Sequence, residues 1–137
     1  MAVSSSIQTS EAIAVAAFRA ALRHFLRRSE RIARQSGLTP QRHLLLLMIK
    51  GAPDGSEQST VTELAERLQL AQSTVTELVR RAEEAGLVER EPSQTDGRVA
   101  HLRLTSEGER RLVLAFTELR HERAYLREAF AHLDETL

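Results

Sequence analysis

One stretch of the chain combines residue types that contact DNA with the spacing of a helix. At about 100° per residue, the segment from about Gln72 to Ala85 turns its polar side chains to one side. These side chains are Ser73, Thr76, Glu77, Arg80 and Arg81. The first turn of a helix in the major groove approaches base edges, and arginine reaches guanine or phosphate. The opposite side is apolar and predicted to be buried: Val75, Leu78, Val79 and Ala82.

Glu77 is the unexpected member of this polar face. A carboxylate repels phosphate unless it accepts a hydrogen bond from a cytosine amino group or holds a neighbouring arginine. The sequence leaves both roles open. The simpler interpretation of the segment is an ordinary amphipathic helix, and it would compete seriously if no second DNA-contacting element followed.

The residues on either side predict a winged helix-turn-helix. Thr60 and Glu63 have the spacing of a capping box, which opens a short helix before a break at 69–71. Gly86 is placed to end the helix that follows. Two segments with strand character come next and predict a two-stranded wing: 87–91 and 99–104.

A long helix is expected from about Ser10 to Gly37, followed by a second one. The apolar positions of the long helix recur at steps of three and four: Phe18, Leu22, Phe25, Leu26, Ser29, Ile32 and Ala33. A separate arginine row is interpreted as a solvated face in preference to a phosphate-binding track: Arg19, Arg23, Arg27 and Arg31. Thr39 caps the second helix, with Pro40 at its first position. Residues 44–49 have no polar face, so this helix is predicted to be buried all round.

The C-terminal region is predicted to be helical, as one helix or two. Its apolar residues form a heptad seam with one arginine inside it: Leu112, Phe116, Leu119, Arg123, Leu126, Phe130 and Leu133. Arg123 should either pair with a carboxylate or mark a bend. Such a seam needs a partner, and the N-terminal helix of the same or a second subunit is the complement, which predicts a homodimer.

The composition is that of a folded protein with an uneven charge distribution. The chain has 137 residues, 42% hydrophobic, with 19 basic and 19 acidic side chains. Residues 1–50 hold eight basic and two acidic side chains, a net charge of +6, and residues 51–137 hold eleven and seventeen, a net charge of −6. Arginine accounts for 18 of the basic side chains and suits bidentate partners such as phosphate and guanine. The balanced total is unusual for a nucleic-acid binder, because such domains are usually basic.

Several function classes lack their sequence signals. The absence of cysteine excludes disulfides, thiolate metal clusters and thiol-based redox sensing. His121 and Glu122 begin a zinc-protease pattern, but Tyr125 stands where the second histidine is needed. No nucleotide-binding loop or nucleophile elbow occurs, so we expect neither an enzyme nor a cofactor or metal. The apolar stretch 12–26 is preceded by Glu11 and interrupted by arginines, which predicts a cytoplasmic protein without a membrane partner.

Several motifs in order resemble the MarR family of winged-helix transcription regulators. The most specific is Asp96-Gly97-Arg98 at the wing, followed by Leu104-Thr105-Ser106-Glu107-Gly108. Three upstream segments sit where the family has them: Thr62-Glu63-Leu64-Ala65, Ser73-Thr74-Val75-Thr76 and the segment from Glu84 to Arg90. The resemblance is close over residues 38–108 and general in the flanking helices. Ala71 departs from the family, since it lacks the side-chain oxygen usual at that helix start.

The resemblance implies a set of DNA contacts. Arg98 would enter the minor groove, whose narrow form concentrates negative potential, with Asp96 fixing its geometry through a salt bridge. The alternative is an Asp-Gly turn that only closes a hairpin. The expected DNA-binding residues are Gln72, Ser73, Thr74, Thr76, Glu77, Arg80, Arg81, Arg90, Asp96 and Arg98.

The resemblance also implies a small aromatic or phenolic effector, because relatives bind such molecules beside the dimerisation helices. The residues that would line this cleft are Phe18, Leu22, Arg42, His43, Leu47 and Phe116. For His43 the simpler interpretation is a histidine satisfied at the edge of the core.

The expected fold is therefore mainly α with a small β wing, a winged helix-turn-helix flanked by dimerisation helices. Three parts are expected: residues 1–37, 38–104 and 105–137. The predicted function is a ligand-responsive repressor that binds an inverted repeat of double-stranded DNA as a homodimer. The alternative is a helical protein-interaction adaptor in which the winged helix binds protein.

Overall fold

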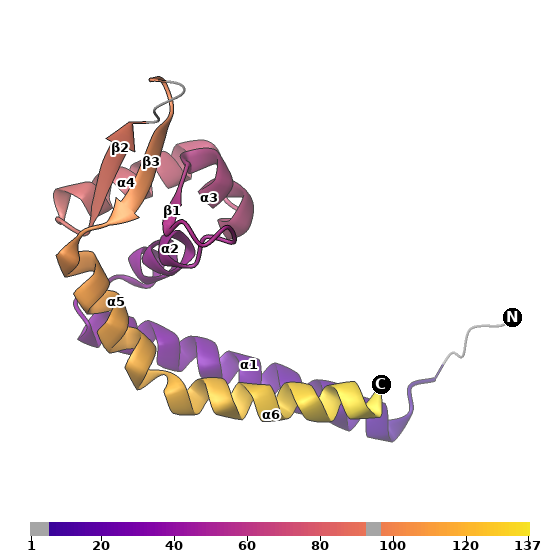
Figure 1. Cartoon of the computed structure of the whole chain (residues 1–137). Helices are drawn as coiled ribbons and strands as arrows, with labels where there is room; N and C mark the ends of the chain where they lie inside the picture. The colour runs from indigo at the N-terminus through magenta and orange to yellow at the C-terminus, as the bar shows by residue number, and fades with distance from the viewer. Residues whose placement is uncertain (1–5, 93–96) are drawn as a thin grey trace, which may run out of the picture. The chain divides into compact units, whose positions relative to one another are not determined.

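The computed structural model describes residues 6–92 and 97–137, and these fold as helices with a small sheet (Figure 1). In chain order the elements are α1 (Thr9–Gln35), α2 (Pro40–Lys50), β1 (Gln58–Ser59), α3 (Val61–Leu68), α4 (Gln72–Glu84), β2 (Val88–Pro92), β3 (Ala100–Leu104), α5 (Ser106–Glu118) and α6 (Arg120–Thr136). The chain divides into two compact units. The winged unit is Ala33–Ala115, and the terminal-helix unit joins the residues up to Ile32 with Phe116–Leu137. None of the helices within the described ranges is long and apolar enough to span a bilayer.

The winged unit encloses one apolar core. Leu45, Leu46 and Ile49 of α2 are fully buried in it. Most of the other residues in this cluster come from α3, α4 and the sheet with the residue before it, including Leu64, Val75, Val79, Leu87 and Leu102. The prediction that α2 is buried all round is wrong, because Leu44 is 44% exposed and Leu47 is only partly buried. Within the winged unit, the neighbours of α2 cover only part of its circumference, whatever the composition of the helix.

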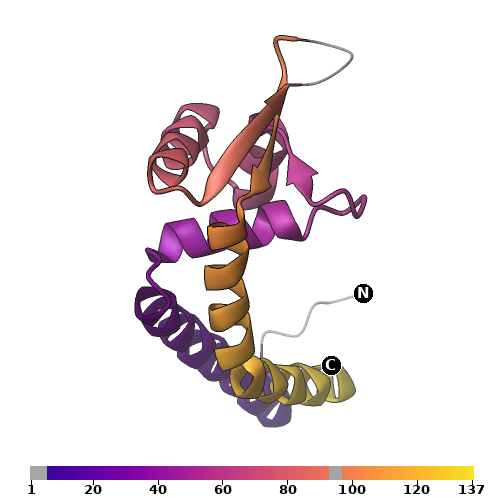
Figure 2. The same cartoon turned by 60° about the vertical axis from the view of Figure 1, so that its left-hand side comes forward.

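The sheet has three antiparallel strands in the order β1-β3-β2. The expected hairpin is present, with Arg90 of β2 opposite Leu102 of β3, and it stands beside α4 (Figure 2). The two-stranded wing was an incomplete prediction, because β1 adds a short edge that pairs Ser59 with Leu102. Two residues are too few for a period-2 pattern, so the sequence carried no signal for this strand.

Local capping signals mark several of the helix ends in the winged unit. Thr39 caps α2 as predicted, and its side chain accepts from the backbone N–H of Arg42 at 3.1 Å. The predicted capping box of Thr60 and Glu63 is formed in both directions. Gly86, at φ +74°, follows the end of α4, and the N–H of Leu87 returns to Ala82. This is the glycine-terminated helix end that the sequence predicts.

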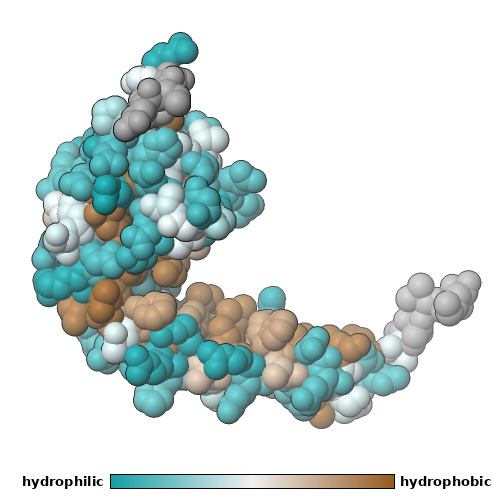
Figure 3. All heavy atoms as spheres, viewed as in Figure 1, coloured by the Kyte–Doolittle hydropathy of each residue, from teal (hydrophilic) through white to brown (hydrophobic). Residues whose placement is uncertain are grey.

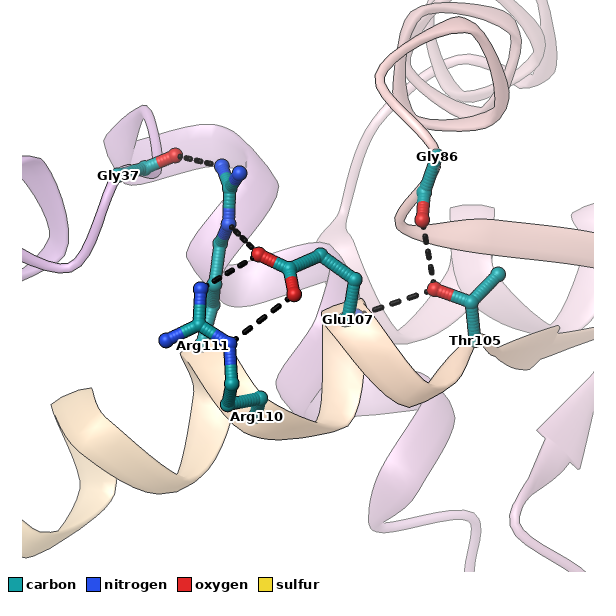
Figure 4. Close-up of polar contacts among 7 residues, drawn as sticks. Gly37, Gly86, Thr105, Glu107, Arg110 and Arg111 are labelled. Carbon is teal, nitrogen blue, oxygen red and sulfur yellow. Dashed lines mark hydrogen bonds and ion pairs between the residues drawn. The ribbon is translucent and has the colours of Figure 1, made fainter.

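The start of α5 is held against the turn between α4 and β2 (Figure 4). The Thr105 hydroxyl donates to the Gly86 carbonyl at 2.6 Å and accepts from the Gly108 N–H at 3.1 Å. The backbone N–H of Thr105 donates to the Leu87 carbonyl at 3.0 Å. A Cβ on Gly108 would lie 2.1 Å from that carbonyl oxygen. The Thr and Gly of the Leu-Thr-x-x-Gly segment therefore let two backbones meet at this junction.

An ion-pair network extends the junction to the loop before α2 (Figure 4). Glu107 accepts from Arg110 at 3.0 Å and from Arg111 at 2.8 Å. These two guanidinium groups lower the pKa of Glu107 to about 2. Arg111 also donates to the Gly37 carbonyl at 2.7 Å. The network thus connects α5 to the glycine that follows α1.

In the terminal-helix unit, α1 and α6 lie side by side and antiparallel (Figure 1, Figure 2). Three contacts link rising positions on α1 to falling positions on α6: Phe18 with Phe130, His24 with Tyr125, and Arg28 with Glu122. The Arg28–Glu122 pair joins Nε to Oε1 at 3.1 Å. Leu26, one of the apolar positions that recur along α1, is 50% exposed.

The C-terminal region consists of two helices, interrupted at Leu119. The bend predicted at Arg123 lies one turn earlier, at Leu119, and the pairing of Arg123 with a carboxylate across a dimer seam stays a prediction. The guanidinium carbon of Arg123 lies 3.9 Å from the ring centre of Phe116, a cation–π contact across the break. The break comes four residues before Arg123, and Leu119 itself is buried there. The heptad spacing of apolar residues continues across the position where the helix is interrupted. The spacing alone therefore did not locate the interruption.

Replacing Gly108 tests the close approach at the junction. In Gly108→Ala, the new methyl group must displace the Leu87 carbonyl, so we expect a loss of roughly 1 to 3 kcal/mol in the free energy of unfolding. Urea denaturation followed by circular dichroism measures it. The matched control is Gly97→Ala, where a Cβ meets nothing within 4 Å. Equal stabilities of the two variants would contradict the role given to Gly108.

Candidate nucleic-acid interface

The polar face predicted on α4 is exposed, and its apolar stripe is buried. Val75, Leu78, Val79 and Ala82 are all in the core, as the wheel predicts. Gln72, Ser73, Thr74 and Thr76 are exposed in the first turns. No side-chain cap bonds the start of the helix at Ala71, in keeping with its missing oxygen. Gln72 donates to Thr62 of α3 at 3.3 Å, which links the two helices at this end.

Four charged side chains on α4 form a cluster, which we call the α4 cluster: Glu77, Arg80, Arg81 and Glu84. Glu77 accepts from Arg80 Nε at 2.9 Å through Oε2, and from Arg81 Nε at 3.0 Å through Oε1. Arg80 also donates through Nη1 to Glu84. The hydrogen bonds from Arg80 and Arg81 lower the pKa of Glu77 to about 2. Glu77 is therefore ionised at neutral pH and holds both neighbouring arginines.

Arg90 lies on β2, next to α4, and is also paired. Its Nε lies 2.9 Å and 3.0 Å from the two carboxylate oxygens of Glu83. The pair joins the last turn of α4 to the first strand of the wing. The side chain of Arg90 is 44% exposed, so one edge of it still faces solvent.

Two further contact residues, Asp96 and Arg98, are predicted from the sequence for the far end of the wing. Asp96 lies outside the described residues. Arg98 follows Gly97 at the end of the wing, just before β3, and is exposed. Their roles in DNA binding stay predictions.

The six residues predicted to line a ligand cleft are divided between the units. Arg42, His43 and Leu47 belong to α2 of the winged unit. His43 is buried, and this burial lowers the pKa of its imidazole. Phe18, Leu22 and Phe116 belong to the terminal-helix unit. Phe18 and Leu22 are partly buried there, and Phe116 is 52% exposed. A ligand site formed by these residues stays a prediction.

Sequence reasoning missed two features beside the interface. Gln69 adopts a left-handed conformation, with φ +57°, in the turn between α3 and α4. Its side chain donates to the Glu66 carbonyl at 2.7 Å. Glu84 was not assigned to the contact face, although its spacing of four from Arg80 is a recognised signal for a helical ion pair. Among the described residues, no group of histidine and carboxylate side chains is arranged to hold a metal ion.

The chain is similar to one family of known proteins. Residues 36–99 match the model of the MarR family. No curated protein sequence matches the chain. Among solved structures, a MarR family transcription regulator has a TM-score of 0.70 at 24% identity, with 90% of this chain and 79% of that chain covered.

Three similar structures contain DNA. A single-residue mutant of MarR from E. coli, complexed with operator DNA, has a TM-score of 0.66 at 20% identity, covering 79% of this chain and 75% of that one. A mutant of MepR from S. aureus, bound to an oligodeoxyribonucleotide, has a TM-score of 0.66 at 21% identity, covering 81% and 79%. The transcriptional regulator MOSR of M. tuberculosis, in complex with DNA, has a TM-score of 0.59 at 29% identity, covering 77% and 74%.

The buried His43 makes stability depend on pH. Its pKa lies below the ordinary 6.5 in the folded chain, so folding favours the neutral imidazole. The free energy of unfolding should be constant above about pH 7 and should fall as the pH drops below 6.5, because the unfolded chain then binds the proton more strongly. Urea denaturation at a series of pH values measures this slope. His43→Gln should flatten the slope, whereas the control His132→Gln, at an exposed position of α6, should leave it unchanged.

Proposed function

The chain belongs to the MarR family of DNA-binding transcription regulators, and from that premise we propose that it is a ligand-responsive repressor that binds an inverted-repeat operator as a homodimer. The observation that carries this proposal is the exposed polar face of α4. Its side chains are not used in packing, while the opposite stripe is fully committed to the core. A helix held by one face and open on the other is suited to enter the major groove.

In this proposal the winged unit contacts DNA at two places. The first turns of α4 approach base edges, with Ser73 and Thr76 in reach of them. Arg80 and Arg81 supply guanidinium groups further along the helix. Arg98 enters the minor groove from the wing, as the motif implies, and its exposed position after Gly97 is compatible with this. Arg90, paired with Glu83 at the base of the wing, would contact the phosphate backbone.

The homodimer is supported by apolar side chains that the terminal-helix unit leaves exposed. On α1 these are Ile13, Val15 and Leu26, and on α6 they are Tyr125 and Phe130, each more than 40% exposed. The apolar surface follows α1 and α6 (Figure 3). Exposed apolar patches of this kind mark protein–protein contacts. A second copy of the chain would cover them and would place two winged units on one operator.

The ligand response and the location complete the proposal. We expect an aromatic or phenolic effector to bind near the six residues predicted for it and to change the affinity for DNA. Relief of repression by such a molecule is the usual logic of a regulator with coupled sites. Because the partner is the operator DNA of the cell, we expect the protein to act in the cytoplasm.

The DNA-binding part is tested by selection from random duplexes, followed by a variant of the wing. Arg98→Ala should weaken binding to the selected duplex by roughly 1 to 3 kcal/mol, the loss of one good arginine contact, without affecting folding. Fluorescence anisotropy measures the affinity. Arg120→Ala removes the same charge from an exposed position of the terminal-helix unit and serves as the control. If both variants bind like the original protein, the wing does not read DNA.

The dimer is tested by placing a charge on its proposed surface. Leu26→Glu should convert a dimer into a monomer in sedimentation experiments at micromolar concentration, because a buried unpaired carboxylate is strongly unfavourable at an interface. The control is Ala20→Glu, which adds the same charge at another exposed position of α1. A dimer should select inverted repeats whose half-site centres lie ~34 Å apart. A monomeric unmodified protein would contradict this assignment of the helices.

A further inference from the structure

The two arginines of α4 are held in different ways, and the difference bears on how the helix reads DNA. Arg80 donates hydrogen bonds from all three of its guanidinium nitrogens. Glu77 accepts from Nε and Nη2, and Glu84 accepts from Nη1. Arg81 is bonded to Glu77 through Nε. Within the part of the chain that the structure describes, the Nη1 and Nη2 groups of Arg81 make no hydrogen bond. This pair of nitrogens is the edge that forms a bidentate contact with guanine O6 and N7.

The α4 cluster has no net charge, since two carboxylates balance two guanidinium groups. An arginine that already faces a carboxylate brings little net positive charge to a phosphate, because one anion only replaces another. Affinity for DNA of any sequence comes mainly from such net charge. A guanine edge differs from a phosphate because it is a neutral acceptor. The Nη1 and Nη2 groups of Arg81 are open to such an acceptor while Nε stays bonded to Glu77.

We propose that Glu77 is a specificity-determining residue, which holds Arg80 and Arg81 so that α4 has little affinity for phosphates of any sequence while Arg81 remains oriented toward a guanine edge. This inference rests on the proposed function, since it concerns the same face of α4. It also chooses between the two roles that the sequence leaves open. Both oxygens of Glu77 already accept from guanidinium groups, so a cytosine amino group would have to compete with charged donors.

The balanced charge of the chain agrees with this arrangement. Outside the α4 cluster, Arg90 is paired with Glu83, and Arg103 on β3 lies 2.9 Å from Glu91. Exposed ion pairs are individually weak, so DNA with the right groups can displace them at small cost. Pairing of this kind therefore acts as a filter on weak binding and does not block the specific complex.

Glu77→Gln tests the inference in the full-length protein. The amide has no charge, so Arg80 and Arg81 should turn toward phosphates. We expect affinity for a scrambled duplex to rise several-fold, and the slope of log affinity against log salt on that duplex to steepen by roughly 1. Affinity for the selected operator should change less than twofold, so the ratio of the two affinities should fall several-fold. Anisotropy titrations on both duplexes at several salt concentrations give all three quantities.

Two further variants separate this effect from general electrostatics. Glu84→Gln frees only Nη1 of Arg80 and should give a smaller change in the same direction. Glu118→Gln changes the net charge by the same amount at an exposed position in the terminal-helix unit, and should change neither slope nor ratio. Thermal unfolding followed by circular dichroism checks that each variant is folded.

The remaining outcomes overturn the inference. A Glu77→Gln variant that loses preference at one cytosine, with unchanged affinity for the scrambled duplex, makes Glu77 a base reader. If Glu77→Gln raises the affinity for both duplexes equally, Glu77 acts only as a general negative charge and has no role in specificity. If neither affinity changes, Glu77 lies outside the interface. If the unmodified protein selects no duplex at all, the proposed function fails and the inference fails with it. If the unmodified protein binds selectively and Glu77→Gln binds in the same way, the inference about Glu77 fails while the proposed function stands.

Discussion

The backbone contact between the turn after α4 and the start of α5 is the constraint on which the winged unit depends. Thr105 satisfies the Gly86 carbonyl and the first turn of α5 with one hydroxyl, and Leu87 lies against Gly108 where a Cβ does not fit. This contact fixes the C-terminal end of α4 and the first residues of β2 relative to α5. The exposed face of α4 and the wing therefore keep a defined relation to each other, which a two-point contact with DNA needs.

The charged side chains of this protein form local ion pairs, which the net charge of the chain does not reveal. A near-neutral chain is unexpected for a DNA-binding regulator. In the structure, arginines on α4 and beside the wing are paired with carboxylates, so positive and negative charges balance locally. Exposed pairs contribute little to stability. In the proposed mode of DNA binding, these pairs matter for recognition, because they leave some guanidinium edges open to DNA and reduce the net positive charge of the surface.

The two units differ in how much of their apolar surface they bury. The winged unit has a continuous apolar core from α2 to β3. Among the described residues of the terminal-helix unit, the fully buried side chains are few and mostly small, such as Ala14 and Ala21, while large apolar residues such as Phe130 stay exposed. Helices in proteins gain most of their stability from packing of an apolar face. The exposed surface of this unit is where the proposed second copy would supply the missing burial.

The sequence by itself determined the features that depend on neighbours along the chain. Capping residues such as Thr60, the glycine after α4 and the apolar stripe around Val75 follow from spacings of three or four residues, and all were predicted. The tertiary structure decided what depends on distant segments: the pairing of β1, the exposure of Leu44 and Leu26, and the break at Leu119 beneath Arg123. The periodicity of a helix shows which residues share a face. Which part of that face is buried depends on the segments that pack against it. For the same reason, the sequence left two roles open for Glu77, whereas the folded helix identified which arginine edges it takes and which it leaves.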